Sequence, residues 1–305
     1  MKTSSRRKTF EIAGSKIDFK RNEDGVVALW AEDDADLARG LGFAHANDRL
    51  VQMMLVRLVG QGRLCECLAN DDETLAIDIF MREMGLRRDA EADVANLGAA
   101  GRSLGDAYAE GVNHYLERHR RPLEFALVKY RPEPWKAADT LLTVKLMSDV
   151  GLAQSQQDME KLLIHMIHGG VPLDKLNRLV APHLDGLDNE TAEFVRRLET
   201  IQPLLPAALR FLTALPTVMA SNNWAVAGSR TASGSPLQCN DPHLECNRLP
   251  AVWYEAVMHT SNDYRIGATM PGVPGLVMGR NRNLSFGFTY GFMDMVDYFI
   301  EDCRD

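Results

Sequence analysis

Short segments with alternating apolar and polar residues open the chain. Apolar residues recur with a period of two between Phe10 and Phe19 and again between Val26 and Trp30. Successive side chains of a β-strand point to opposite faces, so this period is typical of strands with one buried face. The pattern predicts two or three strands within residues 8–30.

From Asp34 the apolar period lengthens to three and four residues, which is typical of amphipathic helices. The pattern continues to about Gly62 and predicts either one long helix or a broken pair. Further helices are expected at residues 74–90, 95–119 and 136–169. The first 200 residues should therefore be mainly helical.

A stretch with three prolines separates this helical part from the rest of the chain. Residues 201–220 are apolar and poor in charge, and we interpret them as a connector. From Ser221 onward, six strand-like runs separated by Gly, Pro, Asn and Asp predict an antiparallel sheet. The chain is thus expected to be α+β, with a helical region at 1–200 and a strand-rich region at 221–305.

Composition and charge narrow the class of protein. With 46% hydrophobic and 25% charged residues, the 305-residue chain should be a folded, soluble protein. The 42 acidic residues outnumber the 34 basic ones, which disfavours nucleic acid as a partner. The five cysteines include no CxxC pair and are expected to be free thiols.

The sequence contains no obvious membrane-directing segment. No apolar run approaches the roughly 18 residues of a membrane span, so no membrane partner is expected. Arg6 and Arg7 are not followed by an apolar run, so no secretory signal is recognised. The location is expected to be cytoplasmic for the sequence as it stands, or periplasmic if a leader has been removed.

One serine stands at the junction between the connector and the strands. The GxSxG, P-loop and HExxH motifs are absent from the sequence. The hydroxyl of Ser221, however, can attack the carbonyl of Ala220 and cut the chain. The freed α-amino group, with a pKa of about 7.7 to 8, can then act as the base for the same hydroxyl. The simpler alternative is a serine that caps a turn before a strand.

The segment from Ser221, SNNWAVAGSRTASGSPLQCNDPHL, resembles the start of the β subunit in the penicillin acylase (penicillin amidase) family of N-terminal nucleophile hydrolases. The later segments WYEAVMH and GATMPGVPGLVMGRNRNLSFGFTYGFMDMVDYFIED are similar to that family's following strands. Upstream, GLGFAHANDRLVQMMLVRLVGQGRL and YRPEPWKAADTLLTVKLM resemble its α subunit. The resemblance covers nearly the whole chain in order.

This resemblance implies an αββα fold and a precursor that cuts itself into an α/β heterodimer. Ser221 would be the nucleophile, Ala220 would precede the cut, and residues 201–220 would be the spacer. His243 lies where the family has a residue beside the nucleophile, a histidine in cephalosporin and acyl-homoserine lactone acylases. Tyr290 matches the position whose backbone N–H contributes to the oxyanion hole. The implied activity is hydrolysis of the linear amide of an acylated small molecule, of the β-lactam antibiotic or N-acyl homoserine lactone type.

The resemblance also implies a structural calcium ion and no organic cofactor. Its ligands would be the carboxylates of Asp158, Asp294 and Asp297 and the carbonyl of Val296. Hard oxygen ligands suit the six- to eightfold coordination of calcium.

Three positions match the family's acyl pocket, where penicillin G acylases have aromatic side chains. They are Leu152, Leu244 and Met278. Unbranched or γ-branched side chains leave an adaptable lining, so the resemblance favours a flexible aliphatic acyl group over phenylacetyl.

The sequence departs from the family in length. The family's β subunit has several hundred residues, whereas 85 residues run from Ser221 to Asp305. The asparagine that completes the oxyanion hole would belong to the missing C-terminal portion of the β subunit, an expected partner. The alternative is an inactive truncated fragment or remnant that acts at most as a calcium-binding or interaction module.

Overall fold

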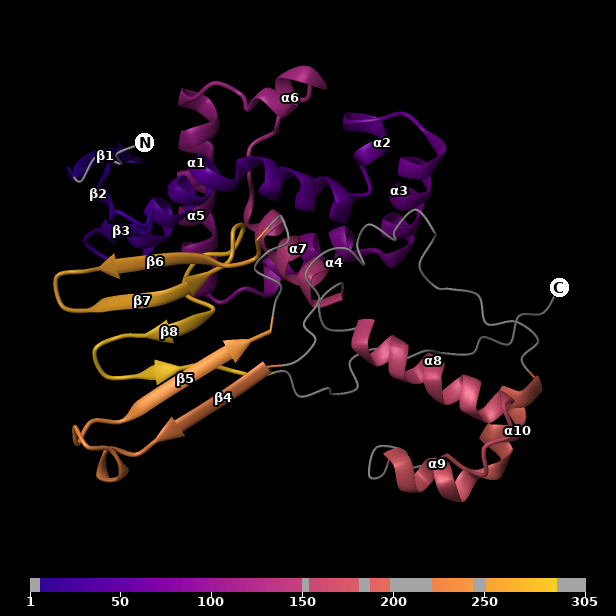
Figure 1. Ribbon diagram of the computed structural model, residues 1–305. Coiled ribbons are helices and arrows are strands. Elements are labelled where there is room, and N and C mark those ends of the chain that lie inside the picture. The colour runs from indigo at the N-terminus through magenta and orange to yellow at the C-terminus, as the bar shows by residue number, and fades with distance from the viewer. Residues whose placement is uncertain (1–5, 150–153, 181–186, 198–220, 244–250, 290–305) are drawn as a thin grey trace.

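The chain combines helices with two β-sheets (Figure 1). The computed structural model describes residues 6–149, 154–180, 187–197, 221–243 and 251–289. The helices are α1 (Asp34–Gln61), α2 (Leu64–Cys67), α3 (Asp72–Met84), α4 (Leu86–Asp93), α5 (Ala99–Arg118), α6 (Leu123–Leu127), α7 (Ala137–Ser148), α8 (Gln154–His168), α9 (Leu173–Val180) and α10 (Asn189–Arg197). The strands are β1 (Lys8–Ile12), β2 (Ser15–Arg21), β3 (Val27–Trp30), β4 (Ser221–Val226), β5 (Leu237–Pro242), β6 (Tyr254–His259), β7 (Tyr264–Thr269), β8 (Met278–Arg280) and β9 (Ser285–Phe286). The expected α+β class is confirmed.

Seven strands form one sheet in the order β1-β2-β3-β6-β7-β8-β9. Neighbours in this sheet are antiparallel except β3 and β6, which run parallel with Val27 beside Ala256 and Leu29 beside Met258. Strands β4 and β5 form a separate antiparallel pair. Figure 1 shows this pair beyond the β8 side of the larger sheet.

The six strands expected after Ser221 are confirmed, but their expected arrangement in one antiparallel sheet is wrong. Strands β6 to β9 extend the N-terminal sheet instead. The reason is burial, because Ala256 and Met258 of β6 enter the same hydrophobic core as Val27 and Leu29 of β3. A shared core thus joins segments from both sides of residues 201–220.

The predicted helices are present, with interruptions at specific residues. Helix α1 begins after Asp33, whose side chain accepts a hydrogen bond from the backbone N–H of Asp36. It ends at Gly62, which has the left-handed conformation (φ 59°) that terminates helices. Arg49 is non-helical, so the structure has the broken pair rather than one regular helix. Gly85, also left-handed, divides the helix expected at 74–90 into α3 and α4.

Helix α1 lies between α5 and the sheet because glycines allow close approach on both sides. A Cβ atom on Gly42 would overlap the backbone carbonyl of Tyr108, and a Cβ on Gly111 would overlap that of Arg39. On the sheet side, a Cβ on Gly40 would lie 2.8 Å from Ile17 Cγ2. These contacts leave no room for side chains at the three glycines.

A buried hydrogen-bond network connects α1 and α5 to the sheet. The N–H of Gly272 donates to the Tyr108 hydroxyl (2.8 Å), which therefore donates to His45 Nδ1 (2.8 Å). The Thr269 hydroxyl donates to the Tyr254 carbonyl (2.7 Å) and therefore accepts from His45 Nε2 (2.9 Å). The partners thus assign a neutral imidazole with its proton on Nε2. Burial lowers the pKa of His45 to about 3.

Helices α8, α9 and α10 surround a second, smaller apolar cluster. It consists of Ile167, Leu176 and Ala192. Three of the five cysteines, Cys65, Cys67 and Cys239, lie in the described ranges and are free, as expected. Within those ranges, no helix combines the length and apolarity needed to cross a membrane.

We expect Gly111→Ala to destabilise the chain because the added methyl group overlaps the backbone of α1. Overpacking of this kind costs about 3 kcal/mol, and the midpoint of urea unfolding should fall accordingly. Gly101→Ala on the same helix is the matched control, since its Cβ would meet only Leu97 Cδ2 at 3.5 Å. That variant should be neutral or up to about 1 kcal/mol more stable. Equal midpoints for the two variants would contradict the close crossing of α1 and α5.

The His45 network predicts a specific loss of stability in acid. The unfolded histidine gains a proton below its ordinary pKa of 6.5, whereas the folded one stays neutral down to about pH 3. The stabilisation is therefore complete above pH 6.5 and is lost as the pH falls toward 3. His45 should account for about 2 kcal/mol of the decrease in unfolding free energy between pH 7 and 5.

This contribution is measured by urea unfolding of wild type and His45→Gln at both pH values. The variant should be less stable at pH 7 but lose about 2 kcal/mol less between pH 7 and 5. A decrease of the same size in both proteins would show that His45 is not buried as the neutral form.

Candidate functional site

Ser221, the expected nucleophile, is the first residue of β4 and is half-buried. Its main chain pairs with Pro242 of β5, and Asn223 pairs with Asn240. Side chains of directly paired residues point to the same face of an antiparallel pair. Ser221 and Asn240 are therefore on one face of the β4–β5 pair. The candidate nucleophile lies at a strand end whose backbone is fixed by the neighbouring strand.

His243, the expected neighbour of the nucleophile, directly follows the partner of Ser221 in sequence. Its Nε2 atom lies 3.2 Å from Asn222 Nδ2 and 3.1 Å from Asp241 Oδ2. Asn222 and Asp241 are a cross-strand pair on the face opposite to Ser221. An Nε2–H donates to Asp241, whereas an Nε2 without hydrogen accepts from Asn222, so the two contacts belong to different tautomers of the ring. The His243 main chain is thus close to Ser221 along the strand, while its ring contacts residues of the other face.

Met278, the described candidate for the acyl pocket, begins β8 and pairs with Ala268 of β7. It belongs to the seven-stranded sheet, whereas Ser221 and His243 belong to the β4–β5 pair. The three candidates that the structure describes therefore come from two separate sheets.

The other predicted site residues lie outside the described part of the structure. They are Ala220, Leu152, Leu244, Tyr290, Asp294, Val296 and Asp297. Asp158 belongs to α8, but its side chain is also outside the description. Among the residues that are described, no group of three or more His, Cys, Asp or Glu side chains is arranged to hold a metal ion. The calcium site stays a prediction.

Two amide side chains on β5, which the sequence did not single out, connect the β4–β5 pair to the chain around β9. Gln238 donates to Asn223 Oδ1 (3.0 Å) and accepts from the Ser285 hydroxyl (2.8 Å). Asn240 contacts the main chain of Phe288. Both belong to the half-buried face of β5, where residues alternate between exposed and half-buried. In sequence, polar Gln238 and Asn240 alternate with apolar Leu237 and Cys239, which predicts a strand with the opposite face buried, so the sequence carries no signal for the two amides.

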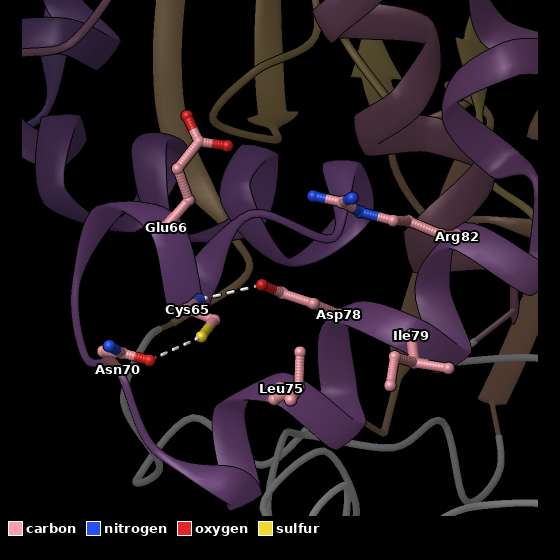
Figure 2. A pocket seen from close by; sticks show the side chains of 7 residues that line it. All are labelled: Cys65, Glu66, Asn70, Leu75, Asp78, Ile79 and Arg82. Carbon is pink, nitrogen blue, oxygen red and sulfur yellow. Dashed lines mark hydrogen bonds between the residues drawn. The ribbon is translucent and has the colours of Figure 1, made fainter.

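A hollow of about 460 Å³ lies between α2 and α3 (Figure 2). It is lined by Cys65, Glu66, Asn70, Leu75, Asp78, Ile79 and Arg82. Its polar groups already have structural partners. Asp78 accepts from the backbone N–H groups of Leu64 and Cys65 (2.8 Å each), and Arg82 donates to the carbonyl of Gly62 (2.8 Å). We therefore attribute this hollow to the packing of α2 on α3 and place the candidate site at β4 and β5.

Comparison with known proteins assigns the chain to a family. The family model described as penicillin amidase matches residues 16–305. An acyl-homoserine lactone acylase, QuiP, from Pseudomonas aeruginosa is 36% identical over 298 residues, which are 94% of this chain and 34% of that protein. The penicillin acylase 2 proenzyme of Pseudomonas sp. (strain SE83) is 31% identical over 93% of this chain and 37% of its own length. Penicillin G acylase of Escherichia coli is 26% identical over 95% of this chain and 40% of its own length.

The chain thus spans between about a third and two fifths of the length of these relatives. The family model covers the helical region, residues 201–220 and the strand-rich region together. The matched residues include both the segments after Ser221 and the upstream segments that resemble the family in sequence. The chain belongs to the penicillin amidase family.

Proposed function

We propose that this chain is part of a self-processing amide hydrolase whose nucleophile is Ser221. The observation that carries the proposal is the position of Ser221 as the first residue of β4, where its main chain pairs with β5. A residue fixed in this way keeps its position when the peptide bond to Ala220 is cut. The cut would release the α-amino group that an N-terminal nucleophile needs as its base.

The reaction would proceed through an acyl-enzyme. The α-amino group of Ser221 accepts the hydroxyl proton while Oγ attacks the amide carbonyl. The same group then donates the proton to the leaving amine as the C–N bond breaks. Water, activated by the α-amino group, releases the acid and regenerates Ser221. The backbone N–H of Tyr290 and the main chain of His243 are the proposed donors to the oxyanion, a contribution of about 3 to 4 kcal/mol per good donor.

For the substrate, we propose an acylated small molecule with an aliphatic acyl group. The named relatives include an acyl-homoserine lactone acylase and two penicillin acylases. His243 and the aliphatic set Leu152, Leu244 and Met278 favour the first kind. No organic cofactor is required for this chemistry. A calcium ion held by Asp158, Asp294, Asp297 and the Val296 carbonyl would have a structural role.

The proposed heterodimer is supported by the core that β3 and β6 share. This core contains segments from both sides of residues 201–220, so the two products of a cut at Ser221 would stay associated. The proenzyme name of one relative is consistent with processing of that protein. The competing proposal is a non-catalytic remnant, which requires an intact bond between Ala220 and Ser221.

We expect N-terminal sequencing and intact mass of the purified protein to reveal a new terminus, Ser221-Asn222-Asn223. The measurement is made on this chain and on the full reading frame that contains it. Ser221→Ala should abolish the cut because it removes the attacking hydroxyl. Ser229→Ala, which removes a hydroxyl in the turn after β4, should leave processing unchanged.

An uncut full-length protein would favour the non-catalytic remnant. A cut that persists in Ser221→Ala would instead show that another nucleophile or a contaminating protease acts on the chain. A cut restricted to the full reading frame would mean that this chain is an inactive fragment of an acylase.

We expect the processed enzyme to prefer a medium-chain fatty-acyl homoserine lactone to penicillin G by at least about tenfold in kcat/KM. Tenfold corresponds to about 1.4 kcal/mol of transition-state binding, which a flexible aliphatic lining can supply. Initial rates of amine release from both substrates measure the ratio. A ratio in favour of penicillin G would contradict the aliphatic pocket but not the role of Ser221.

A further inference from the structure

The side-chain amide of Asn240 connects two main-chain segments that the proposed reaction needs close together. Its Nδ2 atom donates to the carbonyl of Asn222 (3.0 Å) and to the carbonyl of Phe288 (3.0 Å). Its Oδ1 atom accepts from the N–H of Phe288 (3.2 Å). Asn222 follows Ser221 directly, and Phe288 comes two residues before Tyr290. Both donor hydrogens and the acceptor of one amide are therefore used in this link.

The contact with Phe288 resembles the pairing of a neighbouring β-strand. In a hydrogen-bonded pair of an antiparallel ladder, the N–H of one residue donates to the opposite residue, and its C=O accepts a hydrogen bond from that same residue. Asn240 presents an N–H and a C=O to Phe288 in the same way. Strand β5 pairs through its backbone with β4, whereas the described pairing of β9 is with β8. The Asn240 side chain thus takes the place of a ladder between β5 and the residues after β9.

Gly287 provides a second, independent observation, because the absence of a side chain at this position allows the contact with Asn240. A Cβ atom at Gly287 would lie 2.6 Å from both Cβ and Oδ1 of Asn240. That is closer than non-bonded atoms approach, so any other residue would push the segment away from β5. The φ angle of Gly287 is not in the left-handed region, so the glycine supplies space rather than an unusual backbone conformation.

The segment after β9 has little else in the described structure to fix it. Strand β9 has two residues, and Phe286, Phe288 and Thr289 are all exposed. Among the described residues, the backbone pairing of this region ends at Phe286. The two bonds from Asn240 to Phe288 are therefore the main constraint on its position relative to β4 among the described residues.

We propose that Asn240 is a positioning residue that sets the separation between the main chain beside the Ser221 nucleophile and the main chain of Phe288. This inference rests on the proposed function, in which the backbone N–H of Tyr290, two residues after Phe288 in sequence, is a donor to the oxyanion. Asn240 does not touch the reacting atoms. It fixes the main chain beside the nucleophile and, with the same amide, the main chain that leads to the oxyanion donor.

The proposal predicts a loss in kcat rather than in substrate affinity. A displacement of about 1 Å of a reacting or stabilising group can cost on the order of 100-fold in rate. Because the oxyanion forms only in the transition state, KM should change little. We expect Asn240→Ala to lower kcat by about 100-fold and to change KM by less than about threefold.

The experiment uses the processed enzyme and a medium-chain fatty-acyl p-nitroanilide, whose hydrolysis is followed by the release of p-nitroaniline. Gln238→Ala is the matched control, because Gln238 lies on the same face of β5 and connects side chains rather than main chains. It should retain kcat within about threefold. Circular dichroism and the urea midpoint establish that each variant is folded.

Gly287→Ala keeps the Asn240 amide but forces the segment away, so it should reproduce the kcat loss of Asn240→Ala. Asn240→Asp keeps the acceptor for Phe288 N–H and places a carboxylate against two carbonyls. It should be at least as impaired as Asn240→Ala at neutral pH. This combination separates positioning from a general loss of stability, because Gly287→Ala leaves every side chain of β4 and β5 intact.

Two outcomes would overturn the inference. One is a folded Asn240→Ala enzyme with unchanged kcat, and the other is an equal loss of kcat in Gln238→Ala. Failure of the proposed function is seen separately, as hydrolysis that persists in Ser221→Ala. Loss of activity in Ser221→Ala together with a normal Asn240→Ala would reject the positioning role alone.

Discussion

The parallel pairing of β3 with β6 is the constraint on which the rest of the described structure depends. It joins a strand near the N-terminus to one that follows the candidate nucleophile, with Val27 beside Ala256 and Leu29 beside Met258. Parallel strands require a long connection, and here it includes α1 and the other helices. Helix α1 packs on β2 and β3 of the same sheet, and the pairing brings Thr269 within hydrogen-bond distance of His45. A chain cut within this connection would therefore still have its two parts joined by a sheet and a core.

The β4–β5 pair is stabilised by different interactions from those of the large sheet. The large core contains residues of α1, α5 and other helices together with β1, β2, β3 and β6, whereas most residues of β4 are exposed. Amide side chains of β5 connect this pair to β9 and the residues after it. Each such hydrogen bond contributes about 1 kcal/mol, so the candidate site depends on a few specific contacts rather than on burial. Local rearrangement at the site therefore costs less free energy than rearrangement in the core.

The candidate site could be predicted from sequence only where chemistry and chain position coincide. Ser221 stands at the boundary between a connector and a strand, so its own position suggests its role, whereas the role of His243 is implied only by the resemblance to the family. The ring contacts of His243 with Asn222 and Asp241 depend on strand register, which the sequence does not state. The role of Asn240 cannot be predicted from the sequence because it depends on Phe288, whose proximity is decided by the path of the chain between β5 and β9.

Local periodicity determined the elements of this protein, since it reflects which side of each segment is apolar. The strands at 8–30, the helical segment from Asp34 and the six later strands all follow from it, whereas the break at Arg49 is decided by the structure. Motifs along the chain determined the family. Only the tertiary structure decided that β6 pairs with β3, that Gly42 and Gly111 let two helices touch, and that His45 is buried as a neutral imidazole. Each of these features is a contact between segments far apart in sequence. Which segments meet depends on how their buried faces pack together, and no local pattern contains that information.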